Sequence, residues 1–176
     1  MKNQNGESTL STVVAIFLAA VLMFLFPLVA IGQKNDDAAS MFVHEQLQNF
    51  VDNGALKGKI TMNDLEKMKA SIAATNNSYD YEIKVRISDL NPAIKSSTQN
   101  QGDASYYTIF TDQFMSELNA KGVFVFKEGD YISIKAVNTN TTIAQSIRNV
   151  LYGIMGKNDS AISQQASAYV TVTGNN

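Results

Sequence analysis

The chain has 176 residues, enough for one ordinary domain and a membrane segment. Its 14 basic and 16 acidic residues give a net charge of −2, so we expect no basic surface for nucleic acid and no nucleic-acid partner. Because the chain has no cysteine, disulfides, thiolate metal sites and thiol catalysis are excluded.

The N-terminal region contains one long apolar run. No charged residue occurs between Ser8 and Gln33, and every position from Val13 to Ile31 is apolar. A helix of about 20 residues spans the roughly 30 Å hydrocarbon core of a bilayer. We therefore predict a transmembrane helix over residues 7–33.

The flanks of this run indicate its orientation. Basic residues are sparse, but Lys2 and the amino terminus favour an N-terminus inside the cell. Residues 34–176 then form an extracytoplasmic domain. We expect the protein to be a single-pass protein of the cell membrane and, beyond that, to enter a filament at the cell surface.

A cleavable secretory signal is the alternative interpretation of the apolar run. Ala30 and Gly32 supply the small residues that a signal peptidase reads, which would make Gln33 the mature start. However, the run is longer than the roughly 7–15 apolar residues of an ordinary signal. An amphipathic helical pattern also follows it, with no strong helix breaker before Asn53-Gly54. We therefore favour one retained helix, from about Leu10 to Asp52.

Two features of the apolar run bear on packing. Pro27 removes a helical hydrogen bond and is expected to bend the helix, although prolines are also simply more frequent in membrane helices. The small residues Ala15, Ala19, Ala20 and Ala30 would allow a second helix to approach closely.

The pattern of residues in the rest of the chain predicts an α+β fold. In this fold the long N-terminal helix packs on a small antiparallel sheet of about four strands, with short helices. The clearest strand covers residues 79–87, where apolar and charged side chains alternate strictly. We also expect three short helices: one near 62–75, capped by Thr61 with Asp64 in its first turn, one near 109–121, and one after a cap at Thr141 or Thr142. The remaining expected elements are a hairpin within 123–137, a loop over 93–105 and a last strand over 166–172.

No catalytic, cofactor or metal site is predicted, and we expect no enzyme. His44 is the only histidine, and "HEQLQ" lacks the second histidine of a helical zinc motif. The acidic residues in Asn35–Asp37 and Lys127–Asp130 are expected to lie on solvated flanks and turns.

A resemblance to a known family adds to this interpretation. The pattern "GE" at Gly6-Glu7, the apolar run through "FP", the amphipathic helix and "GKITMNDLEKM" resemble type IV pilin-like proteins. With "LNAKGVFVFKEGDYISI" and "ASAYVTVTG", the chain looks more narrowly like the minor pseudopilins of Gram-positive tight-adherence (Tad) pilus systems.

This resemblance implies a leader of residues 1–6, cut by a prepilin peptidase after Gly6 so that Glu7 becomes the first residue. It also implies lateral packing with other pilin-like subunits and contact with their assembly machinery. One departure concerns Ser11, the fifth residue counted from Glu7, because pilins usually place a glutamate at that position.

Two functions follow from these observations. The first is a structural, pilin-like subunit of a pilus, secretion or conjugation apparatus, anchored by its N-terminal helix. The alternative is a membrane-tethered binding or sensing module without a filament role, which would use its loop at Ala93–Ser105.

Overall fold

The structure is a computed structural model that describes residues 4–88, 106–154 and 162–175. It confirms the predicted α+β fold, with a long N-terminal helix, short helices and antiparallel sheets of two and four strands. The elements in chain order are α1 (Gln4–Lys57), β1 (Lys59–Thr61), α2 (Met62–Ala73), β2 (Tyr79–Ser88), β3 (Tyr106–Phe110), α3 (Thr111–Lys121), β4 (Val123–Val125), β5 (Tyr131–Asn138), α4 (Ile143–Ile154) and β6 (Ser163–Tyr169).

The chain divides into two compact units. One, called here the stem unit, comprises Met1–Ala38 and Thr141–Asp159, and so contains α4 and residues 4–38 of α1, which we call its N-terminal half although it is the longer part. The other, called the head unit, comprises Ala39–Asn140 and Ser160–Asn176, and contains the C-terminal half of α1 and all the strands.

The head unit is built on the four-stranded sheet, whose strand order is β3-β2-β5-β6 with every neighbouring pair antiparallel. The alternation predicted for residues 79–87 is observed in β2, where Ile83 and Val85 are buried and Glu82 and Lys84 are exposed. One face of this strand therefore contributes to the core and the other meets water.

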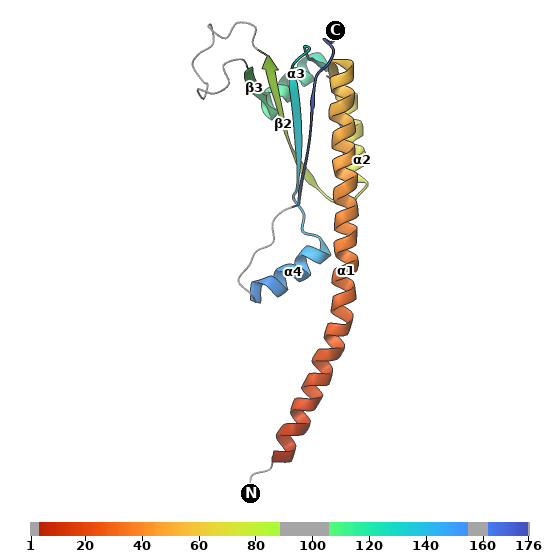
Figure 1. Cartoon of the computed structure of the whole chain (residues 1–176), viewed down its shortest axis with the longest axis vertical. Coiled ribbons are helices and arrows are strands. Elements are labelled where there is room, and N and C mark those ends of the chain that lie inside the picture. Colours follow the sequence, from red (N-terminus) through yellow and green to blue (C-terminus); the bar gives the residue numbers. More distant parts are fainter. Residues whose placement is uncertain (1–3, 89–105, 155–161, 176) are drawn as a thin grey trace. The chain divides into compact units, whose positions relative to one another are not determined.

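The core of the head unit lies between this sheet and helices. The C-terminal half of α1 and α2 lie on one side of the sheet (Figure 1). Apolar residues of α1 recur at the helical period and are fully buried, which confirms the predicted amphipathic pattern. The largest fully buried side chains of the unit are Phe114, Phe124, Phe126, Leu47, Ile60, Leu65, Ile72, Ile83, Leu118, Ile132, Ile134 and Val43.

The predicted hairpin within residues 123–137 is wrong, because its two strands enter different sheets. β4 pairs with β1, in the register Ile60 opposite Phe124, whereas β5 lies between β2 and β6. The turn between them is held by Asp130, whose carboxylate accepts hydrogen bonds from the backbone N–H groups of Lys127 at 2.8 Å and Ser88 at 3.0 Å. Asp130 is buried, so the expectation of a solvated acid at this turn was also wrong.

Helix α1 is longer than predicted at both ends and does not stop at Asn53-Gly54. Gly54 is buried, and a Cβ atom there would lie 2.7 Å from the side chain of Ile60. The glycine therefore serves close packing and is not a stop signal. The helix ends at Lys57, just before Gly58, whose φ of +64° is the left-handed conformation favoured by glycine.

Two other boundaries differ from prediction. Ile109 and Phe110 belong to strand β3 and not to the helix that follows, and the last strand ends at Tyr169. After it the chain leaves the sheet, and the N–H of Gly174 donates to the carbonyl of Phe126 at 3.0 Å. The predicted loop at Ala93–Ser105 lies outside the described residues.

Candidate functional site on the long helix

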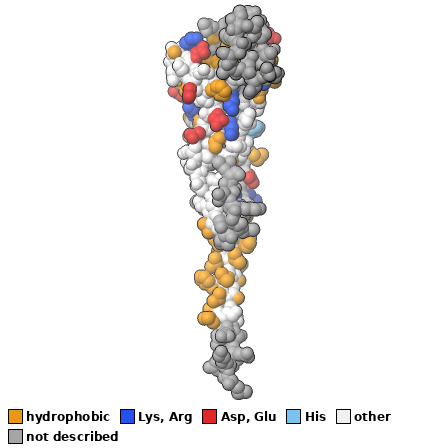
Figure 2. All heavy atoms as spheres, turned by 90° about the vertical axis from the view of Figure 1, so that its left-hand side faces the viewer, with side chains coloured by type: hydrophobic (Ala, Val, Ile, Leu, Met, Phe, Trp, Pro, Cys, Tyr) orange, Lys and Arg blue, Asp and Glu red, His pale blue; other side chains and the backbone are white. Residues whose placement is uncertain are grey.

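The N-terminal half of α1 presents an apolar surface that no described part of the stem unit covers. Its large apolar side chains are mostly exposed, with relative exposures such as 67% for Phe17 and 79% for Phe24. In Figure 2, hydrophobic side chains (orange) gather along this uncovered part of the helix. By length and composition, α1 is one helix that is long and apolar enough to cross a membrane.

Pro27 lies inside α1 and is exposed. The helix is not interrupted there, but its N-terminal half bends (Figure 1). A proline inside a helix removes one backbone hydrogen bond, which is a known cause of bending.

The four alanines predicted to support helix packing are all exposed. Ala15 and Ala19 are four residues apart, so they lie on the same side of α1, one turn from each other. They are available to a partner helix, and their role in packing stays a prediction.

The predicted processing site also lies on this helix. Gly6 and Glu7 fall within the first turns of α1, which begins at Gln4. Cleavage between these two residues stays a prediction.

A polar cluster joins the two parts of the stem unit, just after the apolar segment. The Thr142 hydroxyl donates to Oδ2 of Asp36 at 2.9 Å, and Nη2 of Arg148 lies 3.7 Å from the same oxygen. The side chains of Asp36 and Arg148 are largely buried, at 10% and 16% exposure. This cluster ties α4 to α1.

The N-terminus of α4 is capped within the same cluster. Thr142 is the residue that caps it, one of the two predicted: its Oγ1 accepts from the N–H of Gln145, and Oε1 of Gln145 accepts from the N–H of Thr142. This reciprocal pair satisfies two backbone donors that a helix start leaves free.

The sequence-based interpretation missed this cluster. Asp36 was expected on a solvated flank, and Arg148 was not singled out. The only signal in the sequence was the pairing of a capping threonine with an arginine six positions later. It does not indicate which acid, 106 residues earlier in the chain, would meet them.

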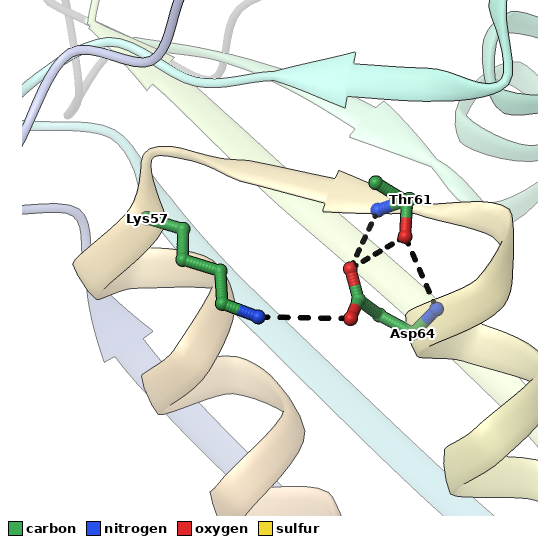
Figure 3. A network of polar contacts seen from close by, with 3 residues as sticks. All are labelled: Lys57, Thr61 and Asp64. Carbon is green, nitrogen blue, oxygen red and sulfur yellow. Dashed lines mark hydrogen bonds and ion pairs between the residues drawn. The ribbon is translucent and has the colours of Figure 1, made fainter.

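A second polar network lies in the head unit, at the C-terminal end of α1 (Figure 3). The Thr61 hydroxyl and N–H donate to Oδ2 of Asp64, Asp64 N–H donates back to Thr61 Oγ1, and Lys57 Nζ lies 3.7 Å from Asp64 Oδ1. This is the capping box of α2, as the sequence predicted at Thr61 and Asp64.

The environment of Asp64 changes its acidity. Burial by itself would raise the pKa of the Asp64 carboxyl, but the hydrogen bonds from Thr61 and the charges of Lys57 and Lys67 outweigh it. The net effect lowers the pKa below its ordinary value.

An open groove of about 180 Å³ runs beside this network, between α1 and α2. Asp64, Lys57 and Lys67 line it together with uncharged side chains. Because Asp64 is already bonded to Thr61 and paired with Lys57, its interactions in this groove stabilise the start of α2.

Among the described residues, no three or more histidine, aspartate or glutamate side chains are grouped as a metal site would require. His44 is exposed on α1. The strongest candidate site is therefore the apolar surface of α1 with the Asp36 cluster at its end.

Comparisons with known proteins add no relative: no family model matches the chain, and neither a curated protein nor a solved structure matches it significantly.

Proposed function

We propose that this protein is a structural, pilin-like subunit, anchored in the cell membrane by α1 and packing laterally with other subunits of a pilus, secretion or conjugation apparatus. Its N-terminus would lie inside the cell and its head unit outside. The observation that carries the proposal is that one helix holds two apolar surfaces of different kinds. Val43, Leu47 and Val51 are fully buried in the head unit, whereas the segment from Leu10 to Ile31 is mostly exposed.

A long exposed apolar segment needs an apolar environment, and about 20 such residues match a bilayer. A plain membrane anchor would need only this length. Ala15 and Ala19 add an exposed stripe of small residues one turn apart, which allows close approach of another helix in a membrane. The resemblance of the sequence to pilin-like proteins favours copies of such a helix as the partner.

Cysteine crosslinking in intact cells tests lateral packing, because the native chain has no cysteine. We expect the Ala19→Cys variant to form crosslinked species with other subunits. Phe24→Cys is the matched control: five residues along a helix correspond to about 140° of rotation, so it lies on another side of the same segment. Equal crosslinking at both positions would indicate random collision and would contradict ordered packing.

Mass spectrometry of the native protein tests the retained helix. A chain that begins at Glu7 supports processing by a prepilin peptidase. A chain that begins at Gln33 would have lost the apolar segment, and the structural role would fail with it. Retention of the segment without ordered crosslinks would favour the alternative, a membrane-tethered binding module.

A further inference from the structure

Helix α4 is attached to α1 by its polar side. Thr142 and Arg148 both meet Asp36, and Gln145, which completes the cap, is 6% exposed. The contacts that hold α4 in the stem unit therefore come from hydrogen-bonding and charged groups.

Val150, an apolar residue of α4, points away from these contacts. Val150 follows Arg148 by two residues, which corresponds to about 200° around an ideal helix, and its side chain is 68% exposed. In sequence, apolar residues recur every three or four positions from Ile143 to Ile154. A helix on a water-soluble protein normally shows the reverse arrangement, with its apolar stripe inward and its polar face outward.

The position of α4 gives this reversed arrangement a physical meaning. Asp36 follows Ile31, the last residue of the apolar run, by five residues, or roughly 7–8 Å along the helix. Within the stem unit, α4 runs obliquely to α1 and not parallel to it (Figure 1). If α1 crosses a bilayer, α4 is then held at the level of the headgroups, inclined to the axis of α1.

We infer that α4 is an interfacial helix, whose apolar side enters the surface of the same bilayer that α1 crosses. Amphipathic helices of this kind bury their apolar face about 5–10 Å into the boundary between headgroups and acyl chains. The sequence of α4 suits this place, because it contains one arginine, no acidic residue and Tyr152, a residue type enriched at membrane interfaces.

Lipid is the expected occupant because Asp36, the residue that holds α4, lies only five residues, or roughly 7–8 Å along the helix, beyond the last residue of the apolar run. The inference rests on the membrane anchoring in the proposed function, but not on assembly with other subunits. Its consequence is that α4, joined to α1 through Asp36, limits how far α1 can slide or rotate in the membrane.

The test uses tryptophan fluorescence, because the chain contains no tryptophan. The full-length variants Val150→Trp, Asn149→Trp and Leu22→Trp are each reconstituted in two kinds of phosphatidylcholine vesicle. One kind carries bromine atoms on the acyl chains near the headgroup, where Val150 and Asn149 are compared, and the other carries them near the ends of the acyl chains, where Leu22 is read. Asn149 is the matched control, since it is the exposed polar neighbour of Val150 in the same helix. Leu22 reports whether α1 is inserted.

We expect the Val150→Trp protein to be quenched roughly two- to threefold more strongly than the Asn149→Trp protein, because its indole would lie below the headgroups. Quenching at Leu22 with no excess at Val150 over Asn149 would overturn the interfacial helix and leave the anchor intact. A copy of the chain or another protein covering α4 would give this same result. Absence of quenching at Leu22 would overturn the anchor and, with it, the interfacial helix.

Discussion

Both halves of α1 carry large apolar side chains, but the two halves expose them differently. In the C-terminal half, Leu47 and Val51 are fully buried against the sheet, and polar residues such as Asp52 occupy the exposed side. In the N-terminal half, apolar residues occupy every side of the helix, and Leu22 is 46% exposed. It is therefore the helical period of the apolar residues, and not their number, that separates a core helix from a segment suited to lipid.

The largest expected change in stability is found by replacing one leucine with alanine in each half of α1 and comparing the two variants. Leu47→Ala should lower the free energy of unfolding of the head unit by about 2–5 kcal/mol, because it leaves a cavity at a fully buried position. Leu22→Ala is the matched control and should change it by less than about 0.5 kcal/mol. Urea unfolding of the full chain in detergent, followed by near-ultraviolet circular dichroism of its tyrosines, measures both; equal effects would remove the distinction between the halves.

The next largest loss of stability is expected at Gly58, directly after the end of α1. Gly58 has positive φ, and a Cβ there would overlap the backbone of Val172 and Gly174, so Gly58→Ala combines strain with a clash. Gly122 also has positive φ but has no atom within 4 Å of an added Cβ. We expect the free energy of unfolding, measured by thermal unfolding, to fall by roughly 1 kcal/mol in Gly122→Ala and by about 2–4 kcal/mol in Gly58→Ala. Equal losses would show that the contact with the C-terminal segment contributes nothing.

A smaller, local effect is expected in the stem unit. Asp36→Ala removes the acceptor of Thr142 and leaves Arg148 without this carboxylate, so α4 should open more readily, by about 1–2 kcal/mol. Amide hydrogen exchange of α4 would then accelerate, while the amides of β5 in the head unit keep their rates. The exposed neighbour Asp37, changed to alanine, is the control. Faster exchange throughout β5 would mean that the two units do not open independently.

The smallest effect is pH-dependent and concerns Asp64 beside the end of α1. Because its pKa is lowered in the folded protein, its contribution is present above the unfolded pKa of 3.8 and is lost as the pH falls through the folded pKa. In the Asp64→Asn variant, the free energy of unfolding should therefore fall less steeply as the pH drops below about 4. The difference from the native protein should be less than about 1 kcal/mol, because the group is partly exposed. Unfolding curves of both proteins at several acidic pH values measure this. An unchanged pH dependence would contradict the role of the carboxylate.

Local patterns predicted much of the fold because their physical causes are local. The alternation in β2, the amphipathic period of α1 and the capping box at Thr61 and Asp64 each depend on residues within one element. The hairpin predicted for β4 and β5 was wrong, because the partner of a strand depends on contacts with residues distant in sequence. Ile60 and Phe124 bring β1 and β4 together, and no spacing within residues 123–137 indicates this.

The candidate site shows the same division. The apolar segment, Pro27 and the alanines were evident from residue type alone. The contact of Asp36 with Thr142 and Arg148 was not, because it joins residues more than 100 positions apart.

Side-chain chemistry and short-range geometry were therefore enough to indicate which segments are apolar, which alternate and where α2 and α4 begin. Three features became known only from the folded chain: Gly54 packs against Ile60 within a continuing helix, Asp130 is buried, and α4 is held by its polar side. Each of these outcomes depends on which distant surfaces come together, and a residue's own type and neighbours do not specify that choice.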